Sequence, residues 1–285
     1  MPFDQQQFRD QSRDAWETAA RGWSAQADWW DADTRPVSDW LVEALAPRPG
    51  SRVLELAAGP GDVGLLLAER LRPGGHALLT DGADAMVAAI EARAAARGLT
   101  DVVAARTMDA EAIDVETGSL DAVACRWGYM LLADPGAALR ETRRVLRSGG
   151  RVALAAWDGP KANPWLSAAA FELRERGLVA PPDPAEPGPF SWRDRAAIGA
   201  RLQDAGFTDV VLDTVHFSYS HPDLDTWWAR AIDLGSSLAN AIAAAGAETA
   251  AAIRAGAEAR IASFVAADGS VTLPAATHVA SAAAV

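Results

Sequence analysis

Short apolar runs alternate with longer amphipathic segments between residues 51 and 158, and Gly and Pro residues separate them. Apolar runs of about four to eight residues bounded by such turn signals are typical of buried strands, whereas the longer segments have the period of helices. The alternation predicts a parallel sheet with helices on both faces, an α/β fold. The expected strands are 52–57, 76–80, 102–106, 121–125 and 151–157, and the expected helices are 63–71, 84–97 and 135–146.

The two flanking regions have different patterns. Residues 4–46 have the pattern of helices, and the prolines at 47 and 49 mark where these helices end. We therefore expect an N-terminal helical cap over 1–46 and a core over 47–158. Five prolines between 181 and 189 exclude a helix or an inner strand there, which indicates a lid or substrate-binding insertion over 159–200.

The last part of the chain, 201–285, is expected to complete the core around a helical insertion. Apolar periodicity predicts its elements. They are a helix at 198–205, a strand at 210–218, Ala-rich helices within the insertion 223–267, and a final strand at 270–280.

Composition and charge restrict the class of partner. The 285 residues are 50% hydrophobic and 22% charged, as in soluble globular proteins, and the net charge of −12 would repel a nucleic acid backbone. The sequence has neither a signal-peptide pattern nor an apolar run of about 18 residues that would span a membrane. Cys125 is the only cysteine, so neither a disulfide nor a Cys-based metal site is expected. We therefore expect a cytoplasmic protein with a small-molecule partner and no metal; nothing in the sequence indicates its oligomeric state.

A glycine-rich turn follows the first expected strand, where open parallel sheets bind ligands. Gly59 and Gly61 have no Cβ atoms, so a ligand can lie against their backbone. Together with Gly64 they match the dinucleotide fingerprint G-x-G-x-x-G, which would favour an NAD-dependent oxidoreductase. Glu55 argues against that function, because a carboxylate inside the strand favours a ligand that is cationic or donates hydrogen bonds. Asp81 ends the next strand, at the offset from Gly61 where an acid binds ribose hydroxyls, and so indicates a nucleoside.

Five ordered motifs resemble those of the class I S-adenosylmethionine-dependent methyltransferases, in particular the methyltransferase type 11 group that includes ubiquinone/menaquinone-biosynthesis enzymes. The motifs lie at 53–61, 80–86, 108–111, 120–130 and 143–154, within a resemblance that covers about residues 15–165. Ala57 and Ser148 stand where the family more often has glycine and proline. The resemblance implies a Rossmann-like, seven-stranded, mostly parallel sheet with an antiparallel last strand and a helical cap.

The resemblance also implies the cofactor, S-adenosyl-L-methionine, and the residues around it. In the family, the acid of the second motif holds the ribose, the methionine after it packs near adenine, and the aspartate of the third motif binds the adenine amino group. The implied cofactor-binding residues are Trp23, Glu55, Ala57, Gly59, Gly61, Asp81, Gly82, Met86, Asp109, Ala110, Arg126 and Trp127.

The implied reaction is in-line transfer of the sulfonium methyl group to a small acceptor. Five of the eleven tryptophans precede residue 41, where the family has its cap, which favours an apolar or aromatic acceptor. The candidates to accept a proton from it are Tyr129, after the fourth strand, and His216 and His221, near the end of a late strand. A protein that binds the cofactor without transferring its methyl group is the alternative.

Overall fold

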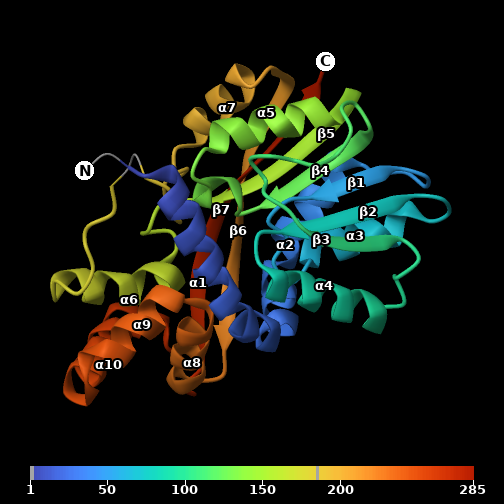
Figure 1. Cartoon of the computed structure of the whole chain (residues 1–285). Helices are drawn as coiled ribbons and strands as arrows, with labels where there is room; N and C mark the ends of the chain where they lie inside the picture. Colours follow the sequence, from blue (N-terminus) through green and yellow to red (C-terminus); the bar gives the residue numbers. More distant parts are fainter. Residues whose placement is uncertain (1–2, 184–185) are drawn as a thin grey trace.

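The computed structural model, which describes residues 3–183 and 186–285, contains one seven-stranded sheet (Figure 1). The strands are β1 (Arg52–Glu55), β2 (His76–Asp81), β3 (Val103–Thr107), β4 (Leu120–Arg126), β5 (Leu146–Trp157), β6 (Phe207–His221) and β7 (Val271–Ala284). Their order is β3-β2-β1-β4-β5-β7-β6, with parallel pairs from β3 to β5 and antiparallel pairs on both sides of β7. The predicted fold with an antiparallel last strand is confirmed.

The strand order reverses between β1 and β4, and this creates the crevice in which open α/β sheets bind ligands. Most elements lie close to where the sequence predicts them, but β5 begins earlier than the predicted strand 151–157, and β6 and β7 are longer than expected. Strands β6 and β7 pair from Phe207 opposite Ala284 to His221 opposite Val271. The ladder therefore continues beyond the apolar residues that the sequence pattern detects.

Helices cover both faces of the sheet. The helices are α1 (Gln5–Ala25), α2 (Ala27–Leu45), α3 (Asp62–Leu71), α4 (Asp84–Ala96), α5 (Pro135–Val145), α6 (Pro164–Glu175), α7 (Arg195–Asp204), α8 (Leu224–Leu234), α9 (Ser236–Ala245) and α10 (Ala247–Ile261), with short 3₁₀ helices at Tyr129–Leu131 and Ala262–Phe264. In Figure 1, α5 and α7 lie on one face, and α2, α3 and α4 lie on the other. Among the residues that the structure describes, no helix has the length and apolarity needed to cross a membrane.

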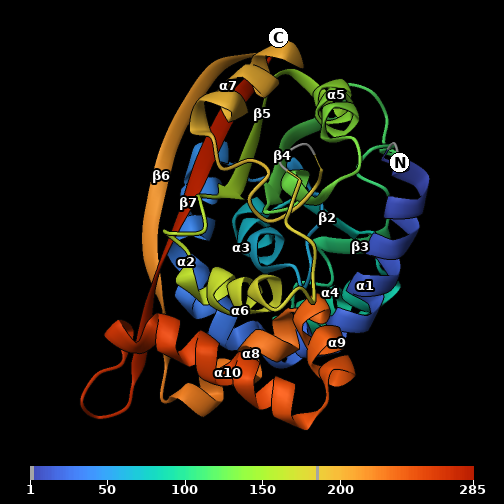
Figure 2. The same ribbon diagram turned by 90° about the vertical axis from the view of Figure 1, so that its left-hand side faces the viewer.

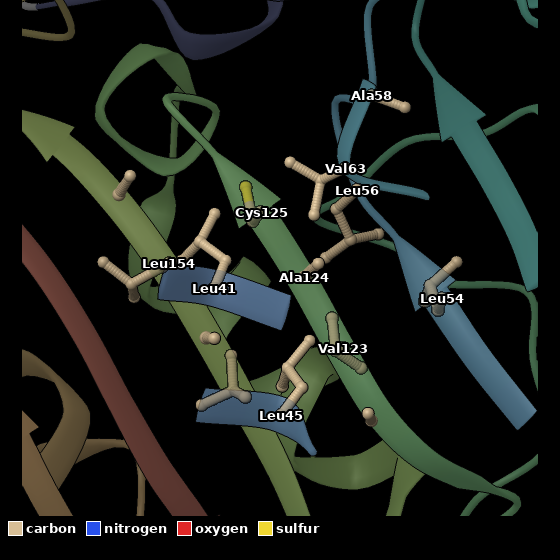
Figure 3. Close-up of a cluster of buried hydrophobic side chains, with 14 of the residues drawn as sticks. Leu41, Leu45, Leu54, Leu56, Ala58, Val63, Val123, Ala124, Cys125 and Leu154 are labelled. Carbon is tan, nitrogen blue, oxygen red and sulfur yellow. The ribbon is translucent and has the colours of Figure 1, made fainter. Parts of the chain in front are cut away.

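The N-terminal segment divides between two places. Helix α2 packs on the sheet, where Leu41 and Leu45 lie against Val123 and Leu154 (Figure 3). These side chains are at most 5% exposed, and truncating one such leucine typically costs about 2–5 kcal/mol. Helix α1 instead lies beside α4 and α8.

A second layer of helices closes the other side of this region. Helices α6, α8, α9 and α10 gather at one end of the molecule (Figure 2). Helix α9 contacts the other three, α6 packs on α10, and α8 and α9 contact α1. Their shared apolar cluster includes Trp227 and Ile253, and it reaches Leu273 of β7. The helical layer is thus anchored to the sheet through its last strand.

Candidate functional site

A cavity of about 1030 Å³ lies over the carboxyl ends of β1, β2 and β4. Its walls also include α1, α6, α8 and the loop before α7. The cavity is continuous from Gly59 and Asp81 at the glycine-rich turn to Trp165 and Trp227 in the helical layer. One hollow therefore joins the predicted cofactor residues to the predicted lid.

The glycines of the turn after β1 have different roles. Gly59 has a φ of 54°, lines the cavity, and has open space where a Cβ would point, so a ligand can lie against it. Gly61 has a φ of 86°, and a Cβ there would come within 3.0 Å of a Leu79 methyl. A Cβ on Gly64 would come within 2.5 Å of Glu55 Oε2. Gly61 and Gly64 therefore allow the turn to pack, and Gly59 faces the cavity.

Glu55 lies beneath this turn and is not part of the cavity wall. Its side chain is 2% exposed, and Oε2 accepts the Gly64 N–H at 2.7 Å. Burial raises the pKa of this carboxyl to about 8, against the opposing effect of Arg126. At neutral pH the group is mostly protonated, which removes the charge that was expected to attract a cationic ligand.

Asp81 is placed in the cavity wall at the end of β2. Its two carboxyl oxygens accept the N–H groups of Gly59 at 2.9 Å and of Ala83 at 3.1 Å. Burial raises the pKa of this carboxyl above its usual range, although these hydrogen bonds oppose the shift. Each oxygen keeps a further lone pair, so the fixed carboxylate can accept hydrogen bonds from a vicinal diol.

The remaining residues of the second and third motifs lie around the same part of the cavity. Met86 and Ala110 are buried, and the position of a Cβ on Gly82 is open. Asp109 is exposed at the rim, where its carboxylate accepts the Glu111 N–H at 2.8 Å. These groups line this part of the cavity with apolar side chains and place one acid at its rim.

Arg126 reaches the cavity wall, but protein groups already hold its guanidinium. Nη1 donates to Thr34 Oγ1 at 2.8 Å and to Ser38 Oγ at 2.9 Å, and Nη2 pairs with Asp62. Asp62 is fully buried and also pairs with Arg93 at 2.5 Å. This ion-pair network joins α2, α3, α4 and β4.

Tryptophans from four elements form the wall next to the turn. Trp127 has a φ of 61°, and its ring stacks on Trp157 with centroids 4.0 Å apart. Its Nε1 donates to Thr277 Oγ1 at 2.9 Å, which fixes the ring. Trp30 meets both Trp127 and Trp165 edge to face, each at 5.5 Å. Sequence reasoning missed Trp157 and Trp165 and did not single out Trp30 among the five tryptophans before residue 41, because only the high tryptophan content signals these rings before the elements are packed.

Helix α1 closes the cavity on the cofactor side. Trp23 lines the cavity, meets Trp30 at 4.8 Å, and donates from Nε1 to the Leu234 carbonyl at 3.3 Å. Near the other end of α1, Arg9 pairs at 2.5 Å with Glu111, which also lies in the wall. The helix is thus held at both ends across the cavity.

Of the three expected proton acceptors, only His221 lies on the cavity. The Tyr129 hydroxyl is buried in the core, 2.6 Å from Thr142 Oγ1, and burial raises its pKa well above the usual value. His216 is exposed on β6, the edge strand. The structure does not bring either of these residues into the cavity wall.

His221 is 4% exposed, and its Nδ1 lies 3.1 Å from Arg230 Nη1. Burial and then Arg230 lower its pKa to about 4, so the ring is neutral at pH 7. A guanidinium only donates hydrogen bonds, so we assign Nδ1 as the acceptor and Nε2 as the protonated nitrogen. In this tautomer, neither ring nitrogen has a free lone pair for a substrate proton.

Three comparisons with known proteins agree with this geometry. Residues 53–150 match a family model described as a methyltransferase domain. The chain is 34% identical to nocamycin O-methyltransferase of Saccharothrix syringae over 62% of its own length and 66% of the relative's. It is 30% identical to the ubiquinone/menaquinone biosynthesis C-methyltransferase UbiE of Shewanella frigidimarina over 68% of its length and 69% of the relative's.

Among solved structures, the [4+2]-cyclase SpnF superposes with a TM-score of 0.52 at 17% sequence identity, covering 87% of this chain and 80% of that one. This likeness concerns the fold. About two thirds of each of the two curated relatives is matched, so the remaining third of each has no counterpart in these alignments.

Proposed function

The chain belongs to the class I S-adenosylmethionine-dependent methyltransferases, and from this premise we propose that it methylates a small acceptor with an apolar or aromatic body. The observation that carries the proposal is the single cavity that runs from the glycine-rich turn to the tryptophan wall. A cofactor and an acceptor that bind in the same cavity can react without either of them leaving it. The names of the two relatives, an O-methyltransferase and a C-methyltransferase, add support for a small-molecule acceptor.

The residues fit the cofactor that the family uses. Open space over Gly59 leaves room for a ligand against the backbone, and Asp81 offers two fixed oxygens to a ribose. Met86 and Ala110 supply an apolar slot for adenine, with Asp109 at its rim. S-adenosyl-L-methionine supplies, when bound, a methyl group on a positively charged sulfur.

The chain contributes position and the exclusion of water to the reaction. Trp23, Trp30 and Trp127 enclose the space beyond the turn, and a closed apolar wall favours a step in which charge on sulfur disappears. Alignment of two reactants in such a site contributes about 7–11 kcal/mol in favourable cases. Of the predicted proton acceptors, only His221 lies on the cavity, and its tautomer leaves no lone pair free to take a proton. We therefore propose that alignment of the two reactants, rather than proton removal by these residues, drives the methyl transfer.

The first test concerns cofactor binding. We expect S-adenosylhomocysteine to bind the free protein in calorimetry and NAD not to bind. Asp81→Ala should weaken that binding by about 1.5–3 kcal/mol, the cost of losing hydrogen bonds to a charged group. Asp114→Ala, which removes an exposed acid at the same edge of the sheet, serves as the control and should leave the affinity unchanged. Equal affinity of wild type and Asp81→Ala would remove Asp81 from the site.

The second test separates methyl transfer from cofactor binding alone. A metabolite extract incubated with the protein and methyl-labelled S-adenosylmethionine should yield a labelled small product that mass spectrometry identifies. Trp23→Ala should lower the rate of its formation, because this ring closes the cavity. Tight cofactor binding with no labelled product in any extract would favour the alternative, a protein that uses the bound cofactor for another purpose.

A further inference from the structure

Arg230 places a guanidinium in the cavity wall without a carboxylate partner. It is half-buried, its ring contact is Trp29 at 4.1 Å, and it donates to the Ser220 carbonyl at 3.1 Å and to Gln26 Oε1 at 3.3 Å. Within the described ranges 3–183 and 186–285, none of its nitrogens lies within the 4.0 Å ion-pair distance of an acid. A cation held by neutral groups in a partly buried wall favours an anionic ligand.

The neighbouring acids do not neutralise this charge by contact. Asp33 and Asp223 attract Arg230 only from beyond ion-pair distance, and the Asp33 carboxylate is occupied by the Ser220 N–H at 2.9 Å. In the same wall, Arg9 and Arg126 each have an acidic partner. Arg174 has no ion pair within the described residues, but Arg230 differs from it in contacting His221.

A second observation points to the same corner of the cavity. The Nε2 of His221, a residue of the cavity wall, carries the proton in the assigned tautomer and is buried without a hydrogen-bond partner in the described part of the chain. The same holds for the hydroxyl of Tyr219, which lies behind the cavity lining. Both rings contact Trp29, at 5.1 Å and 5.4 Å. Leaving a buried polar group unpaired costs about 1–3 kcal/mol, and native proteins seldom do so without a reason.

This corner is at the far end of the tryptophan wall from the glycine-rich turn. Trp127 is next to the turn, since a Cβ on Gly128 would touch the Ala57 side chain at 2.6 Å. From Trp127 the ring contacts lead to Trp30 at 5.5 Å, then to Trp29 at 6.1 Å, and from there to Arg230. An acceptor that spans this row of rings would have one end near the turn and the other at the guanidinium.

We propose that the acceptor carries an acidic group, such as a carboxylate, at the end opposite its methylated atom, and that Arg230 and the Nε2–H of His221 bind that group. The aromatic or apolar body lies along Trp29 and Trp30. This inference rests on the proposed methyl transfer and specifies its substrate class as an elongated organic anion. The cofactor also has a carboxylate, so the experiment must separate the two sources of negative charge.

The experiment compares two fluorescent probes that share one ring system, anionic 1-anilinonaphthalene-8-sulfonate and neutral N-phenyl-1-naphthylamine. Both are titrated into the protein with saturating S-adenosylhomocysteine, so that the carboxylate of the cofactor is already placed. Wild type should bind the anion more tightly than the neutral probe. Arg230→Met should lower the affinity for the anionic probe by about tenfold or more and the affinity for the neutral probe by less than about twofold. The reason is that a charge-assisted hydrogen bond contributes at least about a tenfold difference in affinity. Arg230→Lys should retain part of the preference.

Arg174→Met is the matched control. Arg174 also lines the cavity and stacks on a ring, Phe171, at 4.5 Å, but it lies on α6, away from His221. Its loss should leave the ratio of the two affinities unchanged.

Four results would overturn the inference: no preference for the anion in wild type, equal weakening of both probes by Arg230→Met, loss of the preference in Arg174→Met, or weaker S-adenosylhomocysteine binding in Arg230→Met with the probe ratio intact. The last result would assign Arg230 to the carboxylate of the cofactor. Failure of the proposed function has a different signature, because wild type would then bind no S-adenosylhomocysteine or yield no labelled product.

Discussion

Glu55 illustrates how burial changes what one residue can do. The sequence places an acid four residues before Gly59, and an ionised carboxylate there would attract a cation. In the folded chain, the same carboxyl lies under the turn, accepts the Gly64 N–H, and has a pKa of about 8. Glu55 therefore holds the glycine-rich turn in place and does not contact the ligand itself.

The shift of this pKa predicts a pH-dependent stability. The pKa of Glu55 is raised from 4.5 to about 8 on folding, so the folded protein binds more protons than the unfolded chain between these pH values. The free energy of unfolding should fall as pH rises through this window, by at most about 1.4 kcal/mol per pH unit from this group. Denaturant unfolding at pH 5, 6.5 and 8 should show a smaller decline in Glu55→Gln. Parallel pH profiles for the two proteins would contradict this explanation.

At the scale of elements, a small number of polar contacts beside the cavity hold α1 to the rest of the fold. The Arg9–Glu111 pair joins its first turns to the loop after β3, and Glu111 Oε1 also accepts the Asp134 N–H at 3.0 Å. Glu17 accepts the Ala85 N–H at 3.1 Å from the start of α4. Because α1 covers the predicted cofactor slot, these bonds oppose the opening through which a cofactor would leave.

Loosening α1 should therefore change cofactor kinetics. Arg9→Gln should raise the dissociation rate of S-adenosylhomocysteine several-fold, in line with about 0.5–1.5 kcal/mol for a net hydrogen bond. Stopped-flow tryptophan fluorescence measures the rate directly, since Trp16 and Trp23 lie on α1 and line the cavity. Arg35→Gln, which breaks the exposed Arg35–Asp39 pair on α2, is the control and should have no effect. An unchanged rate in Arg9→Gln would show that this pair does not restrain the helix.

At the scale of the whole molecule, the cavity is assembled from segments far apart in the chain. The turns come from residues 57–60 and 81–83, the aromatic wall from α2, the bend after β4, β5 and α6, and the far end from β6 and α8. A ligand that fills this cavity contacts residues from both apolar clusters, which meet at Trp165. Its binding should therefore stabilise the whole fold.

Thermal unfolding tests this coupling. S-adenosylhomocysteine at about one hundred times its dissociation constant should add about 2.7 kcal/mol to the free energy of unfolding. For a chain of this size, the midpoint should rise by about 5 °C in a single transition. NAD at the same concentration should leave the midpoint unchanged. A ligand-induced shift confined to part of a two-step transition would show that the helical layer unfolds separately from the sheet.

The sequence predicts those features that depend on local pattern and chain order. Apolar periodicity predicts the strands and helices of the sheet, and the acids and glycines at successive strand ends predict where the cavity lies, because the carboxyl ends of parallel strands share one edge. Asp81, Gly59 and Asp109 are found through this rule, and all three line the cavity.

Only the tertiary structure decided how the side chains outside that rule are used. Arg126 pairs with Asp62, Asp62 also pairs with Arg93 of α4, and no spacing in the sequence links these residues; Tyr129 lies in the core. The row of rings from Trp127 to Trp29 and the Arg230 at its end come from α2, the bend after β4 and α8, which are spread over more than a hundred residues. Periodicity records which face of an element is apolar, but the hydrogen-bond partners and burial that set charge and tautomer arise only when distant elements pack together.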